Sequence, residues 1–96
     1  MRDLPEIRKD IDAIDNQLIE LFKRRMNCAK EVACYKTEHN IPILNQQREN
    51  EILADVEAKG GEYGAAAKEL FAKLMELSRD LQHDIIKNGS AIRTAE

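Results

Sequence analysis

The N-terminal part of the chain carries an apolar pattern long enough to constrain the whole fold. Positions of heptad spacing follow one another at steps of four and three residues, with no helix breaker between them. These positions are Ile7, Ile11, Ile14, Leu18, Leu21, Arg25, Cys28, Val32 and Tyr35. Such a repeat predicts a helix whose seam packs against another helix. We therefore expect one very long helix, from about Leu4 to Thr37.

The length of this helix does not fit a small compact monomer. At about 1.5 Å per residue it would be about 50 Å long. A compact chain of 96 residues has a radius of gyration of only about 12 to 13 Å. Much of the seam would project beyond any core that the remaining residues could build. The sequence therefore predicts an oligomer, most simply an intertwined two-fold homodimer that pairs two long helices.

Composition favours an all-α fold and limits the classes of partner. Charged residues make up 34% of the chain and aromatic residues 4%, which is typical of helical proteins. The net charge of −3 argues against a nucleic-acid partner, for which a basic face is expected. No apolar stretch approaches the length of a membrane span, so we expect no membrane partner. Cys28 and Cys34 are expected to be reduced thiols, as in a cytoplasmic protein.

Two further helices are expected after the first. Asn45 is suited to cap the second helix, and Gly60 and Gly61 are suited to end it. The polar residues 88–96 are expected to form an unpacked tail. We predict helices at about residues 4–37, 45–59 and 65–86, in a single all-α domain of residues 1–96.

Polar side chains interrupt the inward faces of all three predicted helices. Arg25 stands where the seam requires an apolar residue, and a buried guanidinium is costly unless an anion meets it. Lys36 returns to within about 20° of Arg25 around the same helix. The complete inward set is Arg25, Lys36, Arg48, Glu49, Ser78 and Gln82. Solvated charges explain any one of these residues, but together they favour a site for a small molecule that carries carboxylates and a hydroxyl.

The absence of metal-binding and nucleophile motifs limits the kind of chemistry to expect. His39 and His83 have no Cys or acidic partners at metal-ligand spacing, and no Ser, His and Asp order suggests a nucleophile. We therefore expect no metal ion and no covalent catalysis. A rigid helical cage of this kind acts by positioning its ligand and by electrostatic stabilisation.

Arg8 is a further cation of the predicted first helix, but it lies far from Arg25 along that helix. It lies seventeen residues before Arg25, which is about 25 Å along one helix, so the two cannot share one small ligand within a chain. An antiparallel partner helix, with its two-fold axis near residue 19, would bring the partner's Arg8 beside residue 30. A dimer can then complete each site in trans.

Four stretches at matching separations resemble the all-helical chorismate mutases of the shikimate pathway. They are Ile7-Arg8-Lys9-Asp10-Ile11-Asp12-Ala13-Ile14-Asp15, the segment Arg25 to Lys36, the segment from Pro42 through Arg48-Glu49, and Ser78-Arg79-Asp80-Leu81-Gln82. The resemblance implies a dimer with two equivalent sites, an isomerase that rearranges chorismate to prephenate without a cofactor. Prephenate serves the biosynthesis of phenylalanine and tyrosine.

The resemblance also implies roles for individual residues. Lys36 and Gln82 would be catalytic, because both would bind the ether oxygen of chorismate. The implied substrate-binding residues are Arg8 of the partner subunit, Arg25, Asn45, Arg48, Glu49 and Ser78. Asn45 departs from the family pattern, since many members have an aspartate there, and this affects how firmly the substrate hydroxyl is held.

Two other functions remain open from the sequence. An isochorismate-pyruvate lyase of the same fold would share the cationic residues, but those lyases lack the glutamate found here as Glu49. A non-catalytic helical dimerisation module would use inward polar residues to set register, yet it would not need three cations around one cavity. Both considerations favour the mutase.

Overall fold

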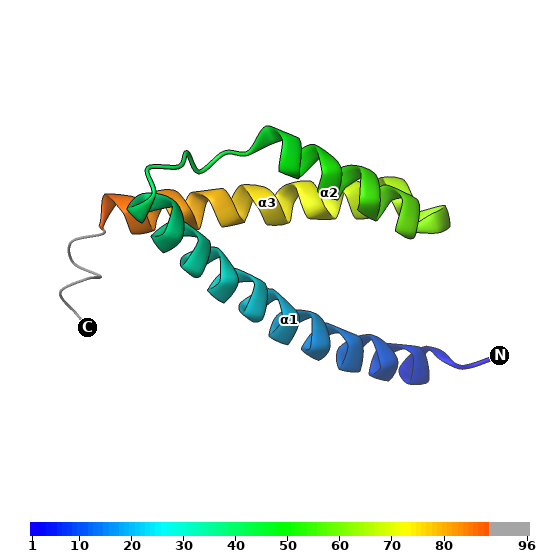
Figure 1. Cartoon of the computed structure of the whole chain (residues 1–96). Helices are drawn as coiled ribbons and strands as arrows, with labels where there is room; N and C mark the ends of the chain where they lie inside the picture. The colour runs from blue at the N-terminus through cyan, green and yellow to red at the C-terminus, as the bar shows by residue number, and fades with distance from the viewer. Residues whose placement is uncertain (89–96) are drawn as a thin grey trace.

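The computed structural model describes residues 1–88, which form three α-helices and one short 3₁₀ helix (Figure 1). The elements are α1 at Leu4–Glu38, α2 at Gln46–Lys59, η1 at Gly61–Tyr63 and α3 at Gly64–Lys87. The predicted all-α class with one very long N-terminal helix is confirmed. Helix ends differ from the expected ones by one residue at most. Beyond Asn88, the expected tail lies outside the described residues.

Local signals in the sequence set both ends of α1. The side chain of Asp3 accepts a hydrogen bond from the backbone N–H of Glu6 at 3.0 Å, and Pro5 occupies the first turn. An N-cap of this kind satisfies one of the amides that a helix start leaves unpaired. The helix ends at Glu38 with His39 as its C-cap, and Asn40 then takes a positive φ of 55°. The chain leaves α1 through a connector that reaches the Asn45 cap of α2.

Glycines build the tight turn between α2 and α3. Gly60 caps α2, and Gly61 has a φ of 57°, a left-handed conformation that favours glycine. A Cβ atom placed on Gly64 would lie 2.3 Å from the carbonyl oxygen of Glu57. The backbones of α2 and α3 therefore approach so closely that Gly64 has no room for a side chain.

The helix α3 is the centre of the packing. It packs against both α1 and α2, whereas α1 and α2 do not pack against each other within the described residues. The small core consists of Ala29, Ala33, Ile43 and Met75. Toward its N-terminus, α1 diverges from the α2–α3 pair (Figure 1). The N-terminal part of α1 therefore stands apart from the other two helices, whereas its C-terminal half, with Ala29 and Ala33, supplies the part of the core that α1 contributes.

The predicted seam of α1 is not buried by its own chain. Large apolar side chains between 48% and 54% exposed follow one another along it, namely Ile11, Ile14, Leu18 and Leu21, and Ile19 beside them is 58% exposed. The buried residues of α1 are instead Ala29 and Ala33. The radius of gyration is 17.1 Å, well above the value of about 12 to 13 Å for a compact chain of this length. The single chain thus presents a long apolar surface, which is what the predicted homodimer requires.

No helix in the described part of the chain combines the length and the apolar character that a membrane crossing needs.

Candidate active site

A cleft of about 320 Å³ lies between α1 and α2, above α3. Apolar side chains from each of these helices and from the connector form part of its wall, including Val32, Ile43, Ile52 and Met75. The cleft also brings together all the site residues predicted from the sequence except Arg8: Arg25, Lys36, Asn45, Arg48, Glu49, Ser78 and Gln82. These residues come from α1, the connector, α2 and α3, so the fold gathers them from distant parts of the sequence.

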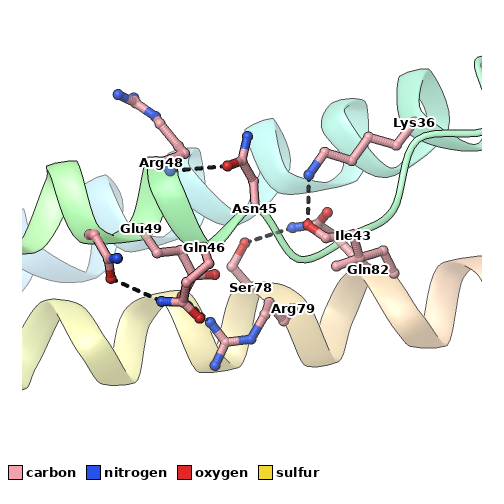
Figure 2. Close-up of polar contacts among 10 residues, drawn as sticks. Lys36, Ile43, Asn45, Gln46, Arg48, Glu49, Ser78, Arg79 and Gln82 are labelled. Carbon is pink, nitrogen blue, oxygen red and sulfur yellow. Dashed lines mark hydrogen bonds and ion pairs between the residues drawn. The ribbon is translucent and has the colours of Figure 1, made fainter.

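The ammonium group of Lys36 is held at the connector. It lies in the last turn of α1 and donates a hydrogen bond to the carbonyl oxygen of Ile43 at 2.6 Å (Figure 2). Ile43 is buried and Lys36 is half-buried, so the contact is largely shielded from solvent. An ammonium group has three N–H donors. Two of them therefore stay available to a ligand in the cleft.

Gln82 is the one buried polar residue of the described chain, at 6% exposure. Its Nε2 donates to the Ser78 hydroxyl at 3.1 Å, because residues one turn apart on α3 share a face. Its Oε1 is buried with no hydrogen-bond partner among the described residues. A buried acceptor without a partner costs about 1 to 3 kcal/mol. Such a cost is consistent with a group that is kept for a ligand.

The carboxamide of Gln82 can present either of its ends to the cleft. A hydroxyl both donates and accepts hydrogen bonds. Ser78 can therefore accept from Nε2 or donate to Oε1. A half-turn of the amide keeps the contact with Ser78 and exchanges the free acceptor for a free N–H₂ donor. The Ser78–Gln82 pair can thus bind an oxygen atom of a ligand.

Glu49 forms an ion pair that sequence reasoning did not find. One guanidinium nitrogen of Arg79, Nη1, donates to Oε1 of Glu49 across the α2–α3 interface (Figure 2). Both side chains line the cleft. A signal was present, because Arg79 precedes Gln82 by three residues and helical positions three apart are neighbours. The partner of Arg79 lies on α2, and the spacing of residues along α3 alone does not identify it.

Asn45 and Arg48 lie at the N-terminal end of α2. The Asn45 side chain accepts from the backbone N–H of Arg48 at 3.0 Å, so its oxygen serves as the helix cap. Its amide N–H₂ is the part that remains for a ligand. The guanidinium of Arg48 is exposed and points away from Glu49 and Ser78 (Figure 2). Arg48 therefore lines the cleft without joining its polar contacts in this structure.

The two arginines of α1 lie in different places. Arg25 is half-buried and lines the cleft. Arg8 is exposed, lies near the start of α1 and does not line the cleft. The structure thus does not bring Arg8 to the cleft of its own chain.

The charge of the cleft is opposite in sign to that of the chain. Four cationic side chains, Arg25, Lys36, Arg48 and Arg79, line it together with one carboxylate, Glu49, whereas the whole chain carries −3. Within residues 1–88 no three His, Cys, Asp or Glu side chains are grouped so that they could hold a metal ion. The arrangement suits a small dianion that also bears a hydrogen-bonding oxygen and a hydroxyl.

Comparison with protein families gives a match over most of the chain. The model of the family described as chorismate mutase type II matches residues 7–83. This range contains every residue that lines the cleft, together with Arg8.

Individual proteins are similar over comparable lengths. A chorismate mutase of Methanocaldococcus jannaschii is 33% identical over 87 residues, which cover 88% of each chain. The T-protein of Haemophilus influenzae is 30% identical over 91% of this chain, but this chain spans only 20% of the T-protein. A solved structure, a conserved hypothetical protein from Pyrococcus furiosus, has 40% identity and a TM-score of 0.68. The match covers 82% of this chain and 93% of that one.

Proposed function

The chain belongs to the chorismate mutase type II family, and on that basis we propose that it rearranges chorismate to prephenate in the cleft between α1 and α2. Chorismate carries two carboxylates, an ether oxygen and a ring hydroxyl. The reaction is an isomerisation in the biosynthesis of phenylalanine and tyrosine. We place it in the cytoplasm, where the free thiols of Cys28 and Cys34 remain reduced.

The observation that carries the proposal is the convergence of Arg25, Lys36 and Gln82 on one cleft. Two cations and a buried carboxamide then face a space of about 320 Å³, which suits a single small molecule. The buried amide of Gln82 also has hydrogen-bonding capacity that the described protein does not use. A helical dimerisation module gives no reason to keep that capacity.

Lys36 supports the reaction because of where charge develops. As the C–O bond of chorismate breaks, partial negative charge builds on the ether oxygen. A donor placed there stabilises the transition state more than the ground state, and only such a difference raises the rate. The Ile43 carbonyl fixes the ammonium through one N–H at 2.6 Å. The other donors of Lys36 can then bind the ether oxygen and a carboxylate.

Gln82 is proposed as the second donor to the same oxygen. In the rotated form its Oε1 accepts from the Ser78 hydroxyl, and its N–H₂ group enters the cleft. Because the side chain is only 6% exposed, its donation occurs away from competing water. Ser78 then acts by orienting the amide.

Arg25 and the partner subunit's Arg8 are proposed to hold the carboxylates. Fixing both carboxylates places the enolpyruvyl arm over the ring, in a conformer that is scarce in solution. The exposed apolar side chains of α1 give a second copy of the chain a surface to cover. An antiparallel pairing of two α1 helices places each Arg8 at the site of the other chain. The proposed enzyme is therefore a homodimer.

Glu49 is proposed to hold the ring hydroxyl. Its Oε1 is paired with Arg79, which leaves Oε2 to accept a hydrogen bond from the ring hydroxyl. The amide N–H₂ of Asn45 and the guanidinium of Arg48 complete this wall of the cleft. Glu49 is also the residue that favours the mutase over an isochorismate-pyruvate lyase, because the resemblance places a glutamate here only in the mutases.

An ultraviolet assay of the purified protein tests the proposed function. Loss of chorismate is followed and the product identified, and isochorismate is assayed in parallel. Formation of prephenate from chorismate is the expected result. Salicylate and pyruvate from isochorismate alone would identify a lyase instead, and no reaction with either substrate would leave the helical dimerisation module as the better account.

A further inference from the structure

The ion pair between Glu49 and Arg79 lies in the wall of the cleft that is proposed to hold the ring hydroxyl. It joins α2 to α3 across thirty positions of sequence. The side chain of Glu49 is 17% exposed and that of Arg79 is 29% exposed, so the pair is shielded more than a surface ion pair. The comparable pair on the same helix, Lys73 with Glu76, is 60% and 50% exposed.

The pair fixes the charge at the hydroxyl-binding end of the cleft. Glu49 and Arg79 together carry no net charge. Asn45 contributes a neutral amide there, where an aspartate would have added a second negative charge. Arg48, which is exposed and also lines the cleft, adds a further positive charge. This end of the cleft therefore presents an oriented carboxylate oxygen in surroundings that are neutral or positive.

We propose that Arg79 determines substrate specificity by offsetting and orienting Glu49, so that the site accepts a neutral hydroxyl on the ring and rejects an ammonium group at the same position. The inference rests on the proposed function. Glu49 accepts one hydrogen bond from a hydroxyl without needing a net negative site. A protonated amine would bring its charge close to the guanidinium of Arg79, and like charges in a partly shielded site repel.

The test compares two substrates in the full-length protein. These are chorismate and 4-amino-4-deoxychorismate, in which an amine that is protonated near neutral pH replaces the ring hydroxyl. The wild-type protein is expected to prefer chorismate in kcat/KM by about tenfold or more. Arg79→Met and Arg79→Gln should lower that preference by about tenfold, because the repelling charge is gone. Arg79→Lys restores a cation and should keep the wild-type preference.

Lys73→Met is the matched control. It removes a cation of α3 from an exposed ion pair outside the cleft, and it should leave the preference unchanged. An equal loss of kcat/KM for both substrates in the Arg79 variants would show a purely structural role and overturn the inference. A wild-type protein that uses both substrates equally well would overturn it too.

Glu49→Gln changes the other partner of the ion pair, so this test does not depend on whether the Arg79 variants fold. With the carboxylate neutralised, the charge of Arg79 is no longer offset. The preference for chorismate should then rise above the wild-type value by about tenfold, whatever the absolute rates. An unchanged or lower preference would contradict the inference. A wild-type protein with no activity on chorismate would instead refute the proposed function.

Discussion

At the scale of single residues, the Lys36 ammonium is the group on which the proposed rate enhancement depends most. It is half-buried, one hydrogen bond to the Ile43 carbonyl fixes its position, and its other N–H donors are free to bind a ligand. A lysine at the surface would reach the same place only by losing more conformational freedom. Lys36 should therefore contribute strongly to kcat and little to the stability of the fold.

Lys36→Ala should lower kcat by about a hundredfold to a thousandfold, the effect typical of removing one donor to a developing charge. Circular dichroism and sedimentation should show unchanged helicity and association. Lys23→Ala is the control, because Lys23 is an exposed lysine of the same helix that does not line the cleft. Loss of helicity or association in the Lys36 variant, with the control unaffected, would indicate a structural role.

Asn45 has a role that is separate from ligand binding. Its side chain caps α2 by accepting from the Arg48 N–H at 3.0 Å. Asn45→Ala should lower the free energy of unfolding by about 1 kcal/mol through loss of this cap. Asn45→Asp should keep the stability, since aspartate caps equally well. Urea denaturation at one fixed protein concentration gives both values, and an alanine variant as stable as the wild type would show that the cap does not matter.

Most of the cleft could be predicted from residue types and periodicity. Arg25 and Lys36 share one helix, so their common face follows from about 3.6 residues per turn. Ser78 and Gln82 follow from the same rule. Arg79 was missed because its partner is on another helix, and no local rule gives the distance between α2 and α3.

At the scale of elements, the ends of the helices followed from local chemistry. Each helix end is set by residues at or next to it. Asp3 caps the start of α1, Asn45 caps the start of α2, and the glycines at positions 60 and 61 end α2. The 3₁₀ helix η1 was not predicted. It lies in the turn that leads to Gly64, where α2 and α3 approach each other closely, and such a contact between elements is not given by local preference.

Gly64→Ala should test this approach directly. The added Cβ would meet the Glu57 carbonyl oxygen at 2.3 Å, so the helices must shift, at a cost of about 1 to 3 kcal/mol. Gly61→Asn is the control, because its φ of 57° suits asparagine and the space around it is open. Thermal unfolding should show a clear loss for the first variant and little for the second. Equal stability of the two would mean that the close approach is not required.

At the scale of the whole molecule, the exposed seam of α1 is the feature that a single chain leaves unexplained. Several large apolar side chains lie on it, and Leu18, near its middle, is 54% exposed. Continuous apolar surfaces of this kind mark interaction sites. The sequence predicted both the seam and its excess length, because heptad spacing and helix rise are local quantities. The sequence of one chain does not by itself show which surface covers this seam.

Leu18→Glu should separate the proposed dimer into monomers, because it places a charge without a partner on the seam. The wild-type protein should sediment at about 22 kDa, twice the 11.0 kDa of one chain. Asn27→Glu adds the same charge at an exposed position about 180° around the helix from Leu18 and should stay dimeric. A wild-type monomer, or a Leu18 variant that associates as tightly as the wild type, would contradict the proposed dimer.

The most direct test of the account as a whole mixes two inactive chains, one with Arg8→Ala and the other with Lys36→Ala. The chains are unfolded together, refolded as a mixture and assayed with chorismate, after separation on two affinity tags has shown that heterodimers formed. In each heterodimer one site keeps both Lys36 and the partner's Arg8. The mixture should therefore recover about a quarter of the wild-type activity, since half of the dimers hold one intact site of two. Heterodimers that form and stay inactive would contradict a site shared between two chains.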